Sequence, residues 1–430
     1  MVFIGQRPKH ESIAAFRDHV SSGKAAFFSQ FGMDFVPGRR EGISLWDVEG
    51  DKRLINCHSN GGVFNLGHRH PAIIAALKQA LDELDIGNHH LISELRARLG
   101  RRLVELAPGN LPYTVFAVGG GEAIDFAIKL ARAHTKRPGV ISARGGCHGH
   151  TGLALAAGDL QYREPFGPMP PGFVQVPFGD AEAAASHMGD GTAAIILETI
   201  PATLGMPIAE PDYFAQLRRL CDRHGAVLIV DEVQSGLGRT GKMWAIEHFP
   251  APGADTVYTE PDILVTGKGL SGGIYPIAAT CYRAELNTFP HNNPFIHVST
   301  FGGAEVGCAV ALTVLDLTAS PAFLQRVNEL AERLASGFSL LQARYPDTLV
   351  EVRQLGLMIG LVFPDETSGP LMTKLLYEEG VLALWANNDK RVLQFLPPLI
   401  MDDMEAEETL GALDRALATL SQMQGWAILH

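Results

Sequence analysis

Residues 228–241 read LIVDEVQSGLGRTG, an apolar run that ends in charged and amide side chains. Open α/β sheets bind ligands at the carboxyl ends of their strands, so Asp231, Glu232 and Gln234 are expected at a binding edge. A carboxylate there can pair with a protonated heterocyclic nitrogen, ligate a metal or cap a loop, and this stretch alone leaves all three open. The letters GLGRTG match the dinucleotide pattern GxGxxG, but residues 231–235 separate them from the strand, so the match is poor.

Around this stretch, strand patterns alternate with helical patterns, which predicts a mainly parallel α/β sheet. Apolar or β-branched runs with little alternation indicate strands that are buried on both faces; they cover residues 138–143, 193–199, 226–231 and 262–266. A helix is expected over 213–224, with Asp212 as its cap and Gly225 as its stop.

A second stretch, VGGGEA at residues 118–123, opens a helix expected over 122–134. Glycines let a ligand approach the backbone closely, and the first-turn N–H groups of a helix form a ready phosphate site. Alone, the triple glycine indicates a flexible loop about as well as it indicates a phosphate site. It fits neither GxGxxG nor GxxxxGK[ST].

The third stretch, DILVTGKGLSGG at residues 262–273, places Lys268 between glycines at the end of a buried strand. A lone lysine is more often a solvated surface group. Here the preceding strand is apolar and glycines crowd both sides, so the amine is expected to point into the crevice at the edge of the sheet. Desolvation lowers the pKa of a lysine and makes its amine a nucleophile for carbonyl groups.

Together the three stretches supply a phosphate cradle, a carboxylate for a ring nitrogen and an imine-forming lysine. Pyridoxal 5'-phosphate (PLP) requires these features, because its phosphate must be anchored, its pyridine must stay protonated and its aldehyde forms a Schiff base. The conjunction is far more specific than any one stretch. The sequence therefore predicts PLP as the cofactor.

Over nearly its whole length, the sequence resembles the class III (subgroup II, ω-type) aminotransferases of the fold-type I PLP enzymes. The most specific motif is the stretch 231–241 with its spacing to Lys268. The other matching motifs are NLGHRHP at 65–71, GGEA at 120–123, His148-Gly149, KGL at 268–270, STFGG at 299–303 and PPL at 397–399. The resemblance implies an α/β fold of the fold-type I PLP-dependent transferases, with a large domain built on a mainly parallel seven-stranded sheet and a small α+β domain. It also implies transfer of an amino group between an amine or amino acid and a keto or aldehyde acceptor.

The resemblance further implies roles for single residues around the cofactor ring. Lys268 would form the internal aldimine and then move the proton, as general acid and base, on the way to pyridoxamine phosphate. Asp231 would pair with the pyridinium nitrogen and keep it protonated. Gln234 would hydrogen-bond the region of the ring's 3-oxygen, with Val233 packed on one ring face.

Further positions follow from the same resemblance. The backbones of Gly120 and Gly121 would bind the phosphate together with Thr300 of a second subunit, which implies a homodimer with shared active sites. Glu198 matches a glutamate near cofactor and substrate, and His148 matches a further cofactor-binding position.

Two positions depart from the family pattern. An aromatic residue usually precedes His-Gly and stacks on the pyridine ring, but this chain has Cys147, which gives less contact area and no π-stacking. An arginine that clamps the α-carboxylate usually stands where this chain has Gln394. Either another cation serves, with Arg144 and Arg53 as candidates, or the amine of the substrate lies far from any acid.

The chain is long enough for two domains, since 430 residues exceed what one hydrophobic core usually covers. We expect an N-terminal segment over 1–64 that joins the small domain, a large PLP-binding domain over 65–320 and a C-terminal small domain over 321–430. In the last part, helical patterns cover 321–343 and 404–424, and 348–363 alternates as strands do around Gly356 and Gly360. The first forty residues show little pattern beyond a short helix near 11–20, and a polar turn is expected at 88–90.

Composition excludes several functions. The net charge of −12 disfavours nucleic acid as a partner, and no apolar run is long enough to span a bilayer. Five cysteines without CxxC spacing indicate reduced thiols rather than a zinc site or disulfides, and hence a cytoplasmic protein without a structural metal.

Three functions remain open. Transamination is the reading favoured by the motifs. A decarboxylase, aminomutase or lyase could use the same Lys268 chemistry, and the changes at Cys147 and Gln394 leave room for it. A non-catalytic protein with this fold is disfavoured, because Lys268 and Asp231 are both present.

Overall fold

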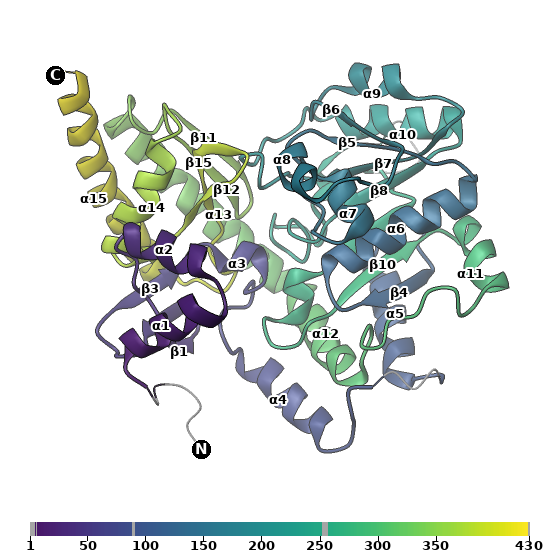
Figure 1. The fold of residues 1–430 in the computed structure, drawn as a ribbon, viewed down its shortest axis with the longest axis horizontal. Coiled ribbons are helices and arrows are strands. Elements are labelled where there is room, and N and C mark those ends of the chain that lie inside the picture. Colours follow the sequence, from purple (N-terminus) through teal and green to yellow (C-terminus); the bar gives the residue numbers. More distant parts are fainter. Residues whose placement is uncertain (1–4, 6, 88–90, 252–256, 429–430) are drawn as a thin grey trace.

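The computed structural model describes residues 5, 7–87, 91–251 and 257–428, so the expected turn at 88–90 lies outside the described residues. Two parts are visible in Figure 1. A large sheet with helices on both faces forms one part, and the other contains elements from the N-terminal and C-terminal segments, with α1 and α2 near the helices and strands of the C-terminal segment.

The large part is built on a seven-stranded sheet. Its strands, in spatial order, are β4 (Tyr113–Ala117), β10 (Ala278–Tyr282), β9 (Ile263–Thr266), β8 (Val227–Asp231), β7 (Thr192–Glu198), β5 (Gly139–Ala143) and β6 (Phe173–Val176). Only β10 runs antiparallel to its neighbours. The mainly parallel seven-stranded sheet is therefore confirmed, and the four strands expected from sequence lie within one residue of β5, β7, β8 and β9 at their ends.

Helices cover both faces of this sheet, which explains why its strands are apolar throughout. On β8, Leu228 and Val230 pack in one core cluster with α10 (Tyr213–His224), and Ile229 packs in another with α6 (Gly120–Thr135). The remaining helices of this part are α4 (Pro71–Leu81), α5 (Glu94–Leu106), α7 (Gly152–Ala157), α8 (Leu160–Arg163), η1 (Glu164–Phe166), α9 (Ala181–His187), η2 (Ala245–His248), η3 (Lys268–Ser271), η4 (Ala284–Asn287), α11 (Thr288–Asn292) and α12 (Glu305–Thr318).

The ends of two helices differ from the sequence expectations. Gly225 ends α10 in the left-handed conformation, with φ of 60°, as expected. Asp212 does not cap that helix with its side chain, which instead accepts a hydrogen bond from Gln216 Nε2 at 2.7 Å. Helix α6 begins at Gly120, two residues earlier than expected, because its glycines already take up helical backbone.

The C-terminal part holds a second sheet of four strands, in the order β11 (Glu351–Leu355), β12 (Met358–Val362), β15 (Asp389–Phe395) and β14 (Leu384–Ala386). The strand pattern over 348–363 is thus confirmed as a β11–β12 hairpin. Gly356 turns it with φ of 58°, and a Cβ there would lie 2.4 Å from the backbone carbon of Thr240. Helices α13 (Pro321–Arg344), α14 (Ser368–Glu378) and α15 (Asp403–Ile428) pack against this sheet, and the core they share is apolar.

The first sixty residues are more regular than the sequence indicates. They form α1 (Lys9–His19), α2 (Ser22–Gln30), β1 (Pro37–Glu41), β2 (Ser44–Asp47), β3 (Arg53–Asn56) and α3 (Ser59–Gly62). Helix α1 matches the short helix expected near residues 11–20, whereas α2 was missed. Neither helix buries a residue, so no apolar stripe marks them. Strand β3 pairs in parallel with β13 (Val381–Leu382), which joins the N-terminal segment to the C-terminal part.

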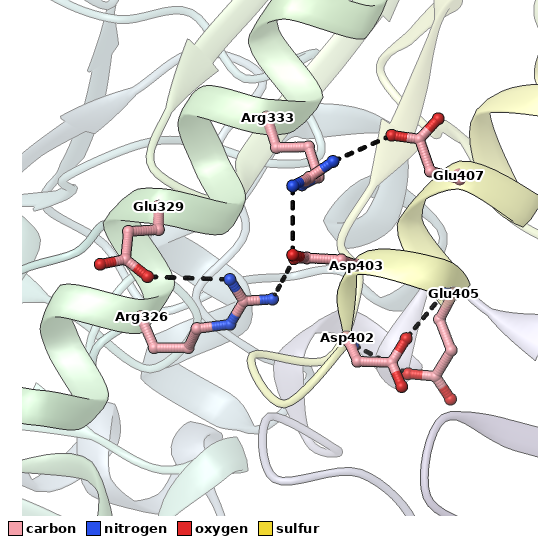
Figure 2. Close-up of polar contacts among 7 residues, drawn as sticks. All are labelled: Arg326, Glu329, Arg333, Asp402, Asp403, Glu405 and Glu407. Carbon is pink, nitrogen blue, oxygen red and sulfur yellow. Dashed lines mark hydrogen bonds and ion pairs between the residues drawn. The ribbon is translucent and has the colours of Figure 1, made fainter.

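An exposed set of ion pairs joins α13 to the start of α15 (Figure 2). The Arg326 guanidinium lies 3.7 Å from a carboxylate oxygen of Glu329 and 2.5 Å from one of Asp403. Arg333 contacts Asp403 and Glu407, each at 3.1 Å. These five residues are called the α13–α15 ion cluster below, and their side chains are 38% to 63% exposed.

Among the described residues, no single helix is long and apolar enough to cross a bilayer. Helices α12 and α13 together meet the length and composition requirements, but they are bent by 65° at their junction.

Candidate active site

Three predicted site residues meet at the carboxyl edge of the large sheet. Glu198 and Asp231 are register partners at the ends of the parallel strands β7 and β8. Strand β9 pairs with β8 and ends at Thr266, two residues before Lys268. Because the three strands run in parallel, the side chains that follow them gather at one edge, where α/β sheets bind ligands.

Lys268 has an unusual backbone and a partly buried side chain. Its φ is +41°, in the left-handed region that non-glycine residues rarely adopt and that is often found at functional sites. Its Nζ donates a hydrogen bond to Oε1 of Gln234. Burial lowers the pKa of Lys268, although the negative charges of Glu198 and Asp231 oppose this shift. The amine is thus more easily deprotonated than an ordinary lysine.

Asp231 is held by His148. The Nδ1 of His148 lies 2.8 Å from Oδ2 of Asp231, and the other oxygen, Oδ1, accepts a hydrogen bond from the Val233 N–H at 3.0 Å. Burial by itself would lower the pKa of His148, but the hydrogen bond and charge of Asp231 outweigh it, so that pKa is raised. This contact fixes the orientation of the Asp231 carboxylate.

Glu198 is the fourth residue at this edge of the sheet, and the backbone of Cys147 hydrogen-bonds to it. The Cys147 N–H donates to Oε1 of Glu198 at 2.8 Å. Burial raises the pKa of Glu198 to about 7, with the positive charge of His148 acting against it. Burial and then the nearby Glu198 raise the pKa of the Cys147 thiol, so it is not an activated nucleophile. His148, Glu198, Asp231 and Lys268 are called the Lys268 cluster below.

The glycine-rich start of α6 reaches the same edge. A Cβ built on Gly120 would lie 3.0 Å from Val233 Cγ1, and one built on Gly267 would lie 3.8 Å from Gly120 Cα. A Cβ on Gly121 would lie 3.0 Å from Oγ1 of Thr151. The N-terminus of a 16-residue helix therefore lies beside Val233 and Gly267, and the positive end of its dipole and its first-turn N–H groups suit an anion there.

Two predicted residues lie apart from this group. Thr300 is exposed, in a segment that packs on edge strand β4 through Gly302, where an added Cβ would lie 2.7 Å from the Phe116 carbonyl oxygen. Gln394 is buried in β15, and its Nε2 donates to the Trp385 carbonyl at 3.4 Å.

The two arginines considered as replacement cations differ in their surroundings. Arg53 is engaged by Glu408 of α15, at 2.9 Å, and by the Ser44 hydroxyl. Arg144 is exposed at the end of β5. Arg53 is therefore not available as the substrate clamp.

Several residues near the site were not found from sequence. The element α3 packs over Lys268, and a Cβ on Gly61 would lie 3.2 Å from Nζ. Tyr162 hydrogen-bonds Asn388 at 3.1 Å and lies edge-on to His150. Arg239 is fully buried and donates to Asn65 Oδ1 at 2.6 Å and to the Pro397 carbonyl. Only the run Ser59-Asn60-Gly61-Gly62, rich in turn-forming residues, carried a local signal.

Comparison with known proteins identifies this arrangement. The family model of the class-III aminotransferases matches residues 29–417. An aminotransferase of uncharacterised function from Archaeoglobus fulgidus is 56% identical over 422 residues, which cover 98% of this chain and 97% of that relative.

The chain belongs to the class-III aminotransferases.

Solved structures agree with this assignment. The ornithine aminotransferase of Toxoplasma gondii ME49 is 25% identical and superposes with a TM-score of 0.85 over 97% of this chain and 96% of its own. The acetylornithine aminotransferase of Elizabethkingia anophelis is also 25% identical, with a TM-score of 0.79 over 96% of this chain and 100% of its own. The fold-type I class is thereby confirmed.

The enzyme is a PLP-dependent aminotransferase that acts on amines and keto acids. The decarboxylase, aminomutase, lyase and non-catalytic readings are therefore set aside. Within the described residues, no group of three or more His, Cys, Asp or Glu side chains is arranged to hold a metal ion.

The residues present fit PLP. Two buried nitrogens, His148 Nε2 and Gln234 Nε2, have no hydrogen-bond partner within the described part of the chain. Unpaired buried donors are costly, so both indicate a polar group that belongs beside them. The glycine-lined start of α6 leaves space for a phosphate, and Asp231 offers an anion to a protonated ring nitrogen.

Proposed function

We propose that Lys268 is the residue that attaches PLP and moves the substrate proton. When bound, PLP supplies an aldehyde that accepts the amino group and a protonated ring that draws electrons from the substrate carbon. The observation that carries this assignment is the position of Lys268 Nζ, which lies among Gln234, Asp231 and Glu198 at the end of the parallel sheet. Its lowered pKa favours the neutral amine that can take up a proton at neutral pH.

Asp231 is proposed to hold the proton on the ring nitrogen of PLP. Its carboxylate is buried and fixed by His148 on one oxygen and by the Val233 N–H on the other. A fixed, desolvated anion favours a cation beside it more strongly than a solvated one does. Val233 would then pack on the ring, and the unpaired Nε2 of Gln234 would donate to the ring's 3-oxygen region.

The phosphate of PLP is proposed to lie at the N-terminus of α6, held by the backbones of Gly120 and Gly121 and by Thr300 of a second subunit. The surface around Thr300 supports a homodimer, because its apolar side chains are exposed: Leu91, Ile92, Phe295, Ile296, Val298 and Phe301. Such clusters mark interaction surfaces.

The amino donor is proposed to carry its amine far from any acid group. Gln394 brings no positive charge, and its amide is already bound to the Trp385 carbonyl. Arg53 is occupied by Glu408. The position next to the ring, Cys147, is small and leaves room for a larger substrate body.

We also propose that the chain divides into an N-terminal segment over 1–64, a large PLP-binding domain over 65–320 and a small domain over 321–430. Pairing of β3 with β13 supports a unit formed by both ends of the chain. A cytoplasmic location is proposed because all five cysteines are unpaired thiols, which suits a reducing compartment.

The test is the visible absorption spectrum of the PLP-loaded protein, recorded while amines are added. The panel includes glutamate, alanine, lysine, ornithine, taurine and simple ω-amines. Conversion to the amino form of the cofactor by ω-amines, with little conversion by glutamate, is the expected result. Equal or better conversion by glutamate would refute the donor assignment, and a protein that cannot take up PLP would refute the assignment of Lys268.

Subunit mixing tests the shared site. Lys268→Ala and Thr300→Ala subunits should each be inactive or weak alone. If Thr300 serves the partner's site, mixed dimers contain one site with both natural residues and recover activity. If Thr300 serves its own subunit, mixing recovers nothing.

A further inference from the structure

Glu232 carries a buried carboxylate for which the proposed chemistry has no use. The residue is 0% exposed, and its N–H still bonds the Val265 carbonyl of β9 at 2.9 Å, so strand geometry extends to it. Successive side chains of a strand point to opposite faces, so Glu232 points away from the face on which Asp231 meets His148. Burying a carboxylate is costly unless hydrogen bonds replace its hydration. The groups around Glu232 therefore indicate why a carboxylate lies there.

Each oxygen of this carboxylate accepts one hydroxyl and one backbone N–H. Oε1 accepts from the Thr199 hydroxyl at 2.7 Å and from the Ile246 N–H at 2.8 Å. Oε2 accepts from the Ser235 hydroxyl at 2.7 Å and from the Ala245 N–H at 3.2 Å. Burial raises the pKa of Glu232 to about 7, and these four hydrogen bonds act against that shift. One side chain thus joins three separate segments of the chain.

The contact with Thr199 lies where the backbone ladder between β7 and β8 ends. The last register pair of the two strands is Glu198 with Asp231, and Thr199 and Glu232 are the next residues along the chain. The hydrogen bond between hydroxyl and carboxylate joins the two segments one position beyond that pair. It thereby holds the end of β7, where Oε1 of Glu198 accepts the Cys147 N–H.

The contact with Ser235 holds a second part of the site. Ser235 directly follows Gln234, whose Oε1 accepts a hydrogen bond from Nζ of Lys268 and whose Nε2 is proposed to donate to the ring's 3-oxygen region. The turn that carries Gln234 is closed by Glu232, because its side chain accepts from Ser235 and its carbonyl accepts from the Gly236 N–H at 3.2 Å. A small displacement of such groups can lower a reaction rate strongly.

We propose that Glu232 is a positioning residue of this enzyme, whose carboxylate holds Glu198 and Gln234 in place through Thr199 and Ser235. This inference rests on the proposed function and adds to it a buried anchor behind the residues that contact cofactor and substrate. Loss of either hydroxyl should therefore change the chemistry at the reacting amine, although every group that touches PLP is retained.

The test removes the Thr199 hydroxyl and compares two substitutions of similar size. Thr199→Val keeps the branched shape and loses the hydroxyl, whereas Thr199→Ser keeps the hydroxyl and loses the methyl group. In steady-state transamination, Thr199→Val should lower kcat by about 3–10-fold with little change in KM, and Thr199→Ser should stay within about twofold of the wild type. Ser235→Ala should resemble Thr199→Val, because it removes the hydroxyl from the other oxygen.

A spectroscopic measurement separates positioning from a general loss of stability. The pH at which the visible band of bound PLP changes depends on the surroundings of the ring's 3-oxygen, which Gln234 is proposed to contact. That pH should move by about 0.5 or more in Thr199→Val and in Ser235→Ala, and it should stay in place in Thr199→Ser.

The matched control is Thr318→Val. The Thr318 hydroxyl is buried and donates to the Val314 carbonyl at 2.8 Å inside α12, so this variant loses a similar hydrogen bond away from the site. Any decrease in its melting temperature should come without a change in kcat or in the visible spectrum.

Glu232→Gln tests whether these effects pass through the carboxylate. The amide nitrogen would face a backbone N–H at whichever oxygen it replaces, so the amide protons of residues 245–246 should exchange with deuterium faster in the PLP-loaded protein. In that background, Thr199→Val should add no further displacement of the visible band, because the hydroxyl acts through the carboxylate.

Wild-type kcat and an unmoved visible band in both Thr199→Val and Ser235→Ala would overturn the positioning role while leaving the proposed function intact. Equal losses of kcat in Thr199→Val and Thr318→Val would overturn it as well, because they would reflect lost buried hydrogen bonds in general. If the wild-type protein transfers no amino group, the proposed function fails and the positioning role fails with it.

Discussion

The Lys268 cluster and the α13–α15 ion cluster use similar residue types in opposite surroundings. In the first, the side chains of His148 and Asp231 are 0% and 5% exposed. In the second, those of Arg333 and Asp403 are 40% and 50% exposed (Figure 2). Both hold acid–base pairs at about 3 Å, yet only in the first does burial shift the pKa of members, raising that of Glu198 and lowering that of Lys268.

The difference shows that geometry alone does not give a charge pair chemical influence. Water and salt screen exposed pairs, so their contribution to stability is small and salt-dependent. Buried groups lose their hydration, and each then depends on its partner for its protonation state. We therefore expect substitutions in the Lys268 cluster to reduce activity or change stability far more than substitutions in the α13–α15 ion cluster. Four substitutions test this expectation, from the largest expected effect to the smallest.

The largest effect should come from Lys268→Ala. The variant loses the amine that attaches PLP and moves the proton, so kcat should fall by at least about 10³-fold. Steady-state transamination with the best ω-amine, and the absorption of bound PLP, measure the two roles separately. Lys374→Ala, on the exposed surface of α14, is the control and should keep full activity. If Lys268→Ala kept a tenth or more of the wild-type activity, Lys268 could not be the residue that attaches PLP and moves the proton.

Asp231→Asn should have the next largest effect. The amide keeps the shape but removes the anion that stabilises both His148 and a protonated ring nitrogen, so kcat should fall by about 10²–10³-fold. The rate of the half-reaction measures this, and the same substitution in the exposed cluster, Asp403→Asn, serves as its control. Equal activities for the two variants would show that burial does not distinguish the clusters.

Glu198→Gln should change stability in a pH-dependent way. The ordinary pKa near 4.5 applies to the unfolded chain, whereas the folded value is about 7. Between these values the folded wild type holds a proton that the unfolded chain has lost, so its free energy of unfolding falls as pH rises, by about 1–3 kcal/mol.

The substituted side chain has no titrating carboxyl group, so the free energy of unfolding of Glu198→Gln should not show this fall with pH. Melting temperatures should match near pH 4.5, and the variant should melt higher than the wild type near pH 8. Glu407→Gln, in the exposed cluster, should show no such divergence. A parallel pH profile for Glu198→Gln and the wild type would contradict the raised pKa.

Asp403→Asn should have the smallest effect. It breaks the contacts with Arg326 and Arg333, but all three side chains are well hydrated. At physiological salt the melting temperature should stay within the spread of replicate melts, and any decrease seen at low salt should vanish when salt is added. A clear loss of stability at high salt would mean that this exposed cluster acts as the buried one does.

Burial also explains which helices and strands could be predicted from the sequence, because buried faces leave apolar patterns. Strands β7, β8 and β9 were found because both faces are covered, which leaves continuous apolar runs. Lys268 and Asp231 were found because strand ends in parallel sheets share one edge. Helix α2 buries nothing and was missed, and α1, which also buries nothing, was expected only as a short helix near residues 11–20.

Other site features depend on contacts between distant parts of the chain. The packing of Gly61 over Lys268 brings together residues that lie about two hundred positions apart in sequence. Engagement of Arg53 by Glu408 is likewise set by the docking of α15. No local pattern encodes such contacts, so the single sequence could not reveal them.

Arg239 has a consequence for the way the protein is made. Its buried guanidinium is bound by Asn65 and by the carbonyl groups of Leu357 and Pro397, so it joins segments from the beginning, middle and end of the chain. A ribosome releases the chain from its N-terminus, and Pro397 emerges only when nearly all of it has been synthesised. Until then this charged group lacks two of its partners and stays hydrated. The contacts of Arg239 are therefore completed only near the end of translation, and nascent chains that stall earlier should be open to proteases.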